Sequence, residues 1–321
     1  MSPDLPHPGR RARPEHYALR TEENARLGTV LRMLEVGIET LRSSSRRRDE
    51  ELDSDDAQRT VNTARAQLGR EPHLLQAEPL SLVRALLVAA KLHLRLEEND
   101  AFLVLDEAPG GSLSAVLVPC AEGIAMHAHS DWVDHLRAHV VFEGDELGYE
   151  LGLQPELHHV PRDDDGAEPG KITHAYAVVT YENRTRDFEV LNGGHLRWIR
   201  SAARRWGERL WEERATDMAR KAAIRQLAHR VPGKSIPFKL ALRLQSAAEV
   251  GADVLADIAK ELRLCRPIEA AASVLARGAG GKIGTRRRAQ KGVGRRPARR
   301  AEDEPCSGTE VASPAAEVAD Q

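Results

Sequence analysis

The stretch ITHAYAVVTYENRTRDFEVLNGGHLRWIR, residues 172–200, decides the fold class. Its first ten residues alternate and are rich in β-branched and aromatic side chains, a pattern that predicts a β-strand. Residues 185–191 form a second strand-like run after Glu182-Asn183-Arg184, so the two runs predict an antiparallel hairpin. From Asn192 onward the apolar spacing becomes helical, with helices expected near 193–205, 207–230 and 237–262.

The segments before this hairpin show the same contrast between helices and strands. Apolar spacing predicts helices near 21–45, 58–70 and 79–94, the last of them apolar on most sides and therefore buried. Strands are expected at 101–105 and 112–118 around a Pro-Gly-Gly turn, and a hairpin at 136–152 around Gly144-Asp145. Because strands cluster in the middle and helices at the flanks, we expect an α+β fold with a central antiparallel sheet.

The length of the chain limits the number of domains, and its charge shows where to look for charged segments. The 321 residues suffice for one sizeable domain with appendages, and 41% of them are hydrophobic. We expect a variable N-terminal region with one helix at 1–57, a core at 58–270 and a disordered tail at 271–321. The 47 basic and 49 acidic residues nearly cancel, so the distribution of charge along the chain is more informative than its sum.

Composition also argues against several classes of protein. The three cysteines, Cys120, Cys265 and Cys306, are far apart and form no CxxC pair, which argues against a disulfide framework and a cysteine zinc site. There is no apolar run of membrane length and no signal peptide. We therefore expect a cytoplasmic protein.

The strongest run of charge lies near the C-terminus. Residues 276–300 hold ten basic residues and no acidic one, whereas residues 301–321 hold six acidic residues and no lysine or arginine. The basic run is rich in glycine and poor in apolar residues, which predicts disorder. It is a candidate for non-specific contact with nucleic acid, and the alternative is a solubilising end.

A second basic feature lies in the expected helix at 207–230. On continuous helical spacing, Arg214, Lys221 and Arg225 fall within about 40° of one another, beside an apolar stripe rich in alanine. A row of such cations suits a nucleic-acid phosphate backbone. The alternative is a solvated face that Glu212, Glu213 and Asp217 partly neutralise, and composition alone favours it.

Several blocks of the sequence together resemble a known family. MARKAAIRQL followed by VP (218–232), RAHVVFEGDELGYELGLQPELHHVP (137–161) and residues 172–200 resemble, in order, motifs of the RecT-type phage recombinases. Residues 61–94 are similar to the family's N-terminal helical part, so the resemblance covers roughly 60–235. The chain departs from the family at Ala121 and Glu122, where an aromatic residue and an arginine are expected.

The resemblance implies the annealing core of the RecT and Red-beta type and a function. Such proteins anneal single-stranded DNA without ATP, form rings or helical filaments, and act in the bacterial cytoplasm beside a 5′-to-3′ exonuclease and a host single-strand-binding protein. We expect DNA contacts from Arg214, Lys221 and Arg225, with Arg220 on another face of the same helix, and from Arg197 and Arg200 on the preceding helix.

No catalytic residue, metal or cofactor is expected for annealing. GAGGKIGT (278–285) lacks the spacing of a nucleotide-binding loop. His127, Asp131 and His135 would share one helix face, but the resemblance places a change from helix to strand there, so no metal site is predicted. Most of the aromatic residues are expected in the core, with base stacking as the alternative. These are Tyr176, Tyr181, Trp198, Trp206 and Trp211.

The sequence leaves two other classes of function open. One is a metal-dependent nuclease that uses Glu143, Asp145, Glu146 and Glu189. The other is an architectural nucleic-acid-binding protein that coats DNA but does not speed the pairing of complementary strands.

Overall fold

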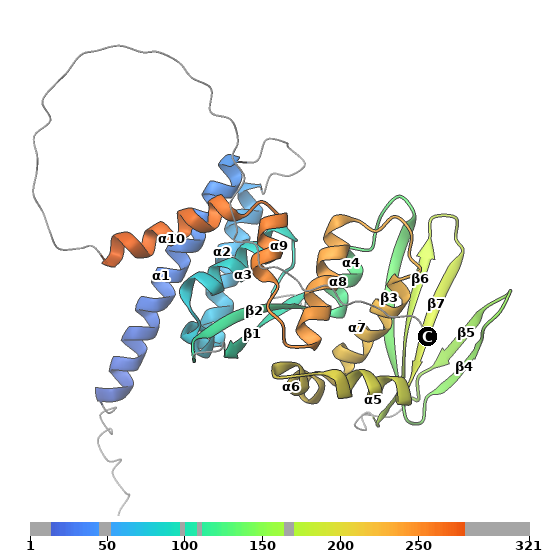
Figure 1. The fold of residues 1–321 in the computed structure, drawn as a ribbon. Helices are drawn as coiled ribbons and strands as arrows, with labels where there is room; N and C mark the ends of the chain where they lie inside the picture. Colours follow the sequence, from blue (N-terminus) through green and yellow to red (C-terminus); the bar gives the residue numbers. More distant parts are fainter. Residues whose placement is uncertain (1–13, 45–52, 97–99, 108–110, 164–169, 280–321) are drawn as a thin grey trace, which may run out of the picture. The chain divides into compact units, whose positions relative to one another are not determined.

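A three-stranded antiparallel sheet supports the basic helix that contains Lys221 and Arg225. Its strands are β3 (Val133–Phe142), β6 (Ile172–Tyr181) and β7 (Arg186–Asn192), in the order β3-β6-β7 (Figure 1). In this computed structural model the described residues are 14–44, 53–96, 100–107, 111–163 and 170–279. The predicted hairpin of residues 172–191 is confirmed as β6–β7, and the α+β class is confirmed with it.

The predicted hairpin at 136–152 is wrong, because its two strands belong to different sheets. β3 pairs with β6, whereas β4 (Glu146–Glu150) pairs with β5 (Glu156–Val160). Gly144 has a φ of +102°, in the region that favours glycine, and Asp145 Oδ2 accepts a hydrogen bond from Phe142 N at 2.7 Å. This turn leads the chain from β3 into the separate β4–β5 hairpin.

The alanine-rich helix α7 (Ala215–Ala228) packs on the sheet. Ala219, Ala222 and Ala223 are fully buried, as are Ala175 and Ala177 of β6. Small side chains on both surfaces let the helix and the sheet approach closely. Residues 207–230 are not one helix, however, because α6 (Trp206–Glu213) ends where Arg214 adopts φ −135° and ψ 41°.

Further helices cover this part of the fold. α5 (Gly193–Ala202) begins where Asn192 Oδ1 accepts a hydrogen bond from His195 N at 2.9 Å. α4 (Ala121–Met126) and α8 (Ile236–Glu249) contact each other, and α4 also contacts α7. Together with the sheet they bury one apolar cluster that includes Met218, Ile224 and Phe238.

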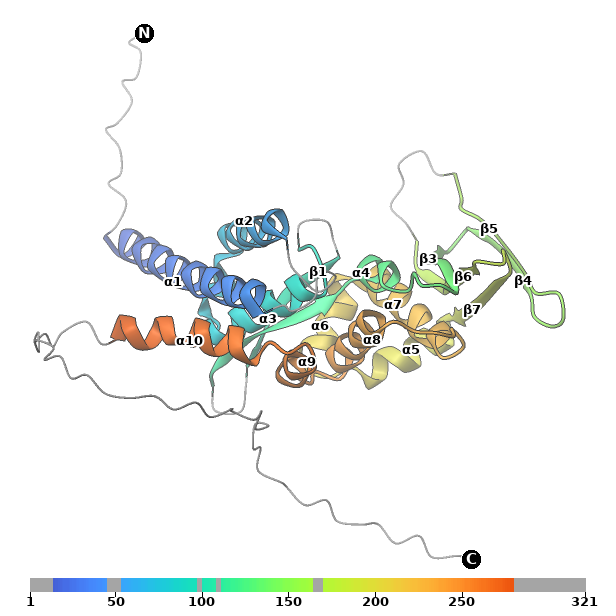
Figure 2. The ribbon, with the colours of Figure 1, turned by 90° about the horizontal axis from the view of Figure 1, so that it is seen from above.

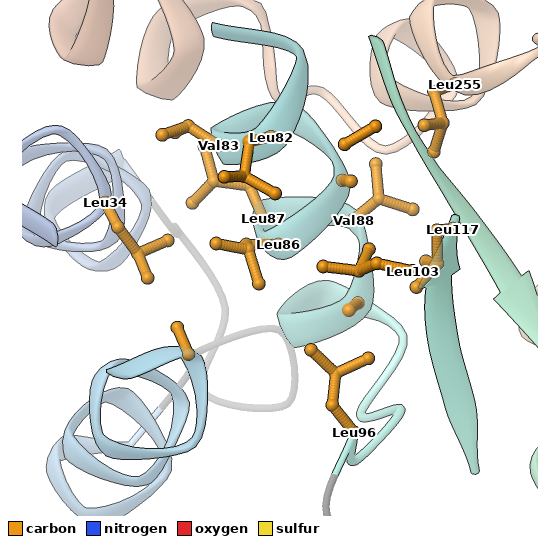
Figure 3. Close-up of a cluster of buried hydrophobic side chains, with 14 of the residues drawn as sticks. Leu34, Leu82, Val83, Leu86, Leu87, Val88, Leu96, Leu103, Leu117 and Leu255 are labelled. Atoms are coloured by element: carbon orange, nitrogen blue, oxygen red, sulfur yellow. The ribbon is translucent and has the colours of Figure 1, made fainter. Parts of the chain in front are cut away.

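A second apolar cluster surrounds α3 (Pro79–Lys91), which is buried along most of its length, as predicted. Its neighbours are α1 (Pro14–Ser44), α2 (Ser54–Arg70), a 3-10 helix (Pro72–Gln76), α9 (Leu255–Glu261) and α10 (Cys265–Ala279) (Figure 2). Figure 3 shows side chains of this cluster on both sides of α3, with Leu34 of α1 on one side and Leu255 of α9 on the other.

The hairpin of β1 (Ala101–Glu107) and β2 (Leu113–Pro119) joins the two clusters. Because side chains alternate along a strand, Leu103 and Leu117 face the α3 cluster. Val104 and Val118 belong to the other cluster, with Met218 and Phe238. The hairpin is therefore buried on both faces, and it ties the helical part to the part that contains the sheet.

The expected boundaries at 57/58 and 270/271 fall inside α2 and α10. α10 packs along α1, and Ala271 is fully buried, so the part of the tail up to Ala279 is helical rather than disordered. The rest of the tail, residues 280–321, lies outside the described residues, as do residues 1–13. No helix in the described ranges is both long and apolar enough to span a membrane.

Gly123 offers a test of the close packing between α4 and the start of β1. A Cβ at this position would lie 2.1 Å from the backbone oxygen of Asp100. We expect Gly123→Ala to lower the free energy of unfolding by about 1–3 kcal/mol, because backbone atoms must move apart. Urea denaturation followed by circular dichroism measures the change.

Gly28→Ala in α1 is the matched control, since nothing lies within 4 Å of a Cβ built there. It should leave stability unchanged or raise it by up to about 1 kcal/mol, because alanine favours a helix over glycine. Equal stability of the Gly123→Ala protein and the wild type would contradict the packing described for α4.

Candidate nucleic-acid interface

Lys221, at the centre of the predicted cationic row, is completely buried. Its Nζ lies 2.9 Å from Asp217 Oδ2, donates a hydrogen bond to the Pro119 carbonyl oxygen at 3.2 Å, and is 5.5 Å from the centre of the Phe102 ring. Asp217 Oδ1 accepts a hydrogen bond from Ala121 N at 2.8 Å. The pair therefore fixes α7 to the end of β2 and the start of α4.

Arg225 is also directed into the protein. It forms an ion pair with Glu249 near the end of α8, and Gln245 Nε2 donates to the other oxygen of that carboxylate at 2.9 Å. Burial lowers the pKa of Arg225 from its ordinary value. One turn beyond, Arg230 binds Asp187 and Glu189 of β7 at 2.9 and 2.6 Å.

The expectation of one exposed row is therefore wrong for Lys221 and Arg225. The helix breaks at Arg214, so that residue does not continue the spacing of α7. Arg214 lies instead over the Phe102 ring, 4.1 Å from its centre, and it remains exposed. Charges that look unpaired within the segment are paired by residues from α8 and β7 and by Asp217 on α7 itself.

Arg220 differs from its neighbours because it reaches the edge of the sheet. Its Nε donates to the carbonyl oxygen of Ala138 on β3 at 2.8 Å, and its guanidinium pairs with Glu122 of α4. A quarter of its side chain is exposed. Ala121 and Glu122, the two departures from the family pattern, are thus both partners of α7.

Two hollows meet at Arg220 along the outer edge of β3. The first, about 520 Å³, is lined by residues that include Asp145, His159, Arg162 and Thr216. The second, about 370 Å³, is lined by residues that include Glu122, His135 and Arg137. Arg220 and His139 line both, so the hollows adjoin at these two residues, and together they are called the groove beside β3.

A chain of hydrogen bonds supports the wall of the first hollow. His159 Nε2 lies 3.2 Å from Asp145 Oδ2, and its Nδ1 lies 3.1 Å from the Tyr176 hydroxyl. Hydrogen bonds from the backbone of Arg162 and Phe142 and from His159 lower the pKa of Asp145. Burial and the nearby Arg220 lower the pKa of His139, which is therefore neutral at pH 7. The groove thus contains cationic, anionic and neutral groups.

The predicted arginines of α5 are exposed. Arg197 lies near the start of the helix, and Arg200 Nη2 lies 3.6 Å from Glu212 Oε1 on α6. Trp198 between them is 69% exposed, which makes the expectation of a core position wrong for this residue. Tyr176, Trp206 and Trp211 are buried as expected, and Tyr181 is half-buried.

Sequence reasoning missed Trp132, Arg137 and His139. Trp132 is 63% exposed, and the other two are exposed on β3 and line the groove. The spacing of Arg137 and His139 places them on one side of a strand, but nothing local shows that β3 is an edge strand. That follows only from its pairing with β6, which lies beyond the β4–β5 hairpin.

The residues of the nuclease alternative are not gathered into a metal site. Glu189 is paired with Arg230, and Asp145 with His159. Within the described ranges no three His, Cys, Asp or Glu residues form a group able to hold a metal ion. α4 ends at Met126 and β3 begins at Val133, so His127, Asp131 and His135 do not share a helix face.

Comparison with known proteins gives two matches. The family model described as the RecT family matches residues 55–250. The protein named Protein RecT from Escherichia coli (strain K12) is 28% identical over 182 residues, which are 55% of this chain. The match spans 66% of the length of that relative, just under two thirds.

Replacing Lys221 tests its structural role. Lys221→Met removes the cation and leaves the Asp217 carboxylate without its partner in a largely buried position. We expect the free energy of unfolding to fall by about 3–5 kcal/mol, because an uncompensated buried charge remains. Denaturant unfolding at neutral pH measures the loss.

Lys239→Met is the matched control, because Lys239 lies on the exposed side of α8. That replacement should change stability by no more than about 0.5 kcal/mol. If the two variants were equally stable, Lys221 would not hold the fold together in the way its contacts imply.

Proposed function

The chain belongs to the RecT family, and from this premise we propose that it binds single-stranded DNA and anneals complementary strands in homologous recombination. The match over residues 55–250 is the observation that carries the proposal, since these residues contain the sheet, α7 and the groove beside β3. Pairing takes place without ATP, in the bacterial cytoplasm. An exonuclease and a host single-strand-binding protein remain expected partners.

Annealing requires DNA binding and no covalent chemistry. Two complementary strands repel each other through their phosphates, and a protein promotes pairing when it neutralises the phosphates and leaves the base edges free. Such a function needs no nucleophile, general base or resident cofactor. Exposed arginines on α5 and before α7, together with Arg220 in the groove, meet this requirement.

We assign the phosphate contacts to Arg197, Arg200, Arg214 and Arg220. The first three are exposed, and Arg220 lies where the two hollows meet. Trp198 adds an exposed ring on which a base stacks. Lys221 and Arg225 act as positioning residues, because they hold α7 against β2 and α8 and thereby place Arg214 and Arg220 at the surface.

The arginine assignment is tested with a triple variant, Arg197→Ala, Arg200→Ala and Arg214→Ala. We expect single-strand affinity at roughly 0.15 M salt to fall at least tenfold, and the slope of log K against log salt to flatten by roughly 2, since three phosphate contacts are lost. Fluorescence anisotropy with a labelled oligonucleotide across a salt series measures both quantities.

The control triple variant removes equal charge from exposed positions outside the matched region, with Arg32→Ala, Arg263→Ala and Arg266→Ala. The slope of log K against log salt should differ from the wild-type slope by no more than about 0.7, the value expected for one phosphate contact. Equal losses in the two variants would mean that only total charge matters and would refute the assignment.

Annealing itself is measured with complementary labelled strands, without ATP. We expect the protein to speed pairing while both strands keep their length, and the triple variant to lose the acceleration. Shortened strands after addition of Mg²⁺ would favour the nuclease alternative. Binding without faster pairing would favour the architectural alternative.

A variant of Glu122 should change DNA affinity in the opposite direction. Its carboxylate pairs with Arg220 and neutralises the cation at the centre of the groove. Glu122→Gln removes this charge with little change in shape, so we expect tighter single-strand binding and a salt slope steeper by roughly 0.7. Glu269→Gln on α10, where the side chain is exposed, should leave both unchanged.

A further inference from the structure

The three-stranded sheet has a second face, on the side away from α7 (Figure 1). Side chains alternate between the two faces along a strand, and residues paired in register share a face. Ala175, Ala177 and Leu191 face α7, because they belong to the same apolar cluster as Met218 of that helix. The alternating positions form the far face. They are His135, Arg137 and His139 of β3, Tyr176, Val178 and Thr180 of β6, and Arg186, Phe188 and Val190 of β7.

The helices that contact the sheet pack on its α7 side. Ile124 of α4 and Leu196 and Ile199 of α5 join the apolar cluster on that side. The base of the β4–β5 hairpin reaches the far face at one end, where His159 Nδ1 lies 3.1 Å from the Tyr176 hydroxyl. Away from this contact, the far face presents exposed side chains at its margins and half-buried valines near its centre.

The charges of the sheet are sorted between its two faces. Asp187 and Glu189 of β7 point to the α7 side, where both are paired with Arg230. The paired residues of the far face include no acidic side chain, whereas Arg137 and Arg186 are exposed there. No ion pair involves either arginine in the part of the chain that the structure describes. The far face is therefore a cationic surface.

The histidines of the far face add little charge at pH 7. Burial lowers the pKa of His139, which is therefore neutral at this pH. His135 Nδ1 lies 3.2 Å from the carboxylate of Asp134, at the bulge where β3 begins. The positive charge of the face thus comes from Arg137 and Arg186. Their strands lie two strand spacings apart, about 10 Å, so the two guanidinium groups suit different phosphates.

The far face meets the groove along β3. Arg137 and His139 line the groove from the far face, whereas Arg220 reaches it from α7. Cations from both sides of the sheet therefore converge on one edge strand. A strand of DNA on either side can approach this edge, and a second strand is repelled by the first unless its own phosphates also meet cations.

We propose that the far face, through Arg137 and Arg186, holds the second, incoming strand of DNA during annealing. The first strand occupies α5, Arg214 and Arg220, and the two strands pair beside β3. This deepens the proposed function, on which it rests, by assigning the second strand a surface of its own.

The double variant Arg137→Gln with Arg186→Gln, made in the full-length chain, tests the proposal. A fluorescent first strand is saturated with protein, a complementary strand with a quencher is added, and pairing is followed by the loss of fluorescence. We expect the pairing rate at roughly 0.15 M salt to fall about tenfold, and its salt slope to flatten by roughly 1.4, since two phosphate contacts are lost. Affinity for the first strand alone, measured by anisotropy, should change less than about threefold.

Arg32→Gln with Arg266→Gln is the matched control, because both arginines are exposed and lie on α1 and α10. It should pair the strands at the wild-type rate. A wild-type rate for the far-face variant, or equal slowing in the control, overturns the proposal. A loss of first-strand affinity as large as that of the α5 triple variant also overturns it, because the far face would then belong to the first-strand site.

Arg137→Lys with Arg186→Lys distinguishes lost charge from a disturbed fold. It keeps both positive charges, so the pairing rate should return to within about twofold of wild type. A lysine variant as slow as the glutamine variant would contradict the proposed role of charge. A wild-type protein that does not speed pairing would contradict the proposed function itself. A wild-type protein that speeds pairing, with an equally fast glutamine variant, would contradict the far-face assignment alone.

Discussion

The buried ion pair of Lys221 with Asp217 is the interaction on which the rest of the structure depends. A buried ammonium group must be stabilised by an opposite charge and by hydrogen bonds. Here Asp217 of α7 supplies the charge, and the Pro119 carbonyl at the end of β2 accepts a hydrogen bond. The other carboxylate oxygen of Asp217, Oδ1, accepts a hydrogen bond from Ala121 N and so fixes the first turn of α4. One helix thereby orders β2 and α4 around it, and its alanine-rich side lies on the sheet.

The β1–β2 hairpin connects α7 to the helical part of the chain. Its strands are buried on both faces, so a shift of α7 relative to β2 would disturb Leu103 and Leu117 in the α3 cluster as well as Val104 and Val118. α8 strengthens the link, because Leu240 and Leu244 join one cluster and Phe238 and Ala241 the other. The part that contains the sheet and the helical part around α3 therefore pack on the same hairpin and on the same helix.

Much of the fold could be predicted from the sequence because its signals are local. The alternation of residues 172–191 and the apolar character of residues 79–94 gave β6, β7 and α3. The pairing of β3 could not be predicted, because β4 and β5 intervene before its partner β6. The break at Arg214 was missed because the helical pattern of the side chains continues through it.

The site was harder to predict than the fold because most of its buried cations are paired with residues far away in the sequence. Lys221, Arg225 and Arg230 look alike in sequence, but each is paired with acidic groups, and two of them with groups 24 to 43 positions away. Exposure cannot be derived from spacing when the partner is remote. Arg197 and Arg200 were easier, because α5 has a single buried stripe, Leu196 and Ile199, and its other positions face outward.

The ion pairs decide which parts of the described surface remain cationic. Ion pairing removes Lys221 and Arg225 of α7 from the outer field, so the proposed phosphate contacts are left to α5, Arg214 and the groove beside Arg220. Residues 143–160, which include the β4–β5 hairpin, carry five acidic residues and no lysine or arginine, so this segment repels phosphates. A near-neutral chain can therefore attract a phosphate backbone at one surface and repel it from another, because charges of opposite sign are separated along it rather than mixed.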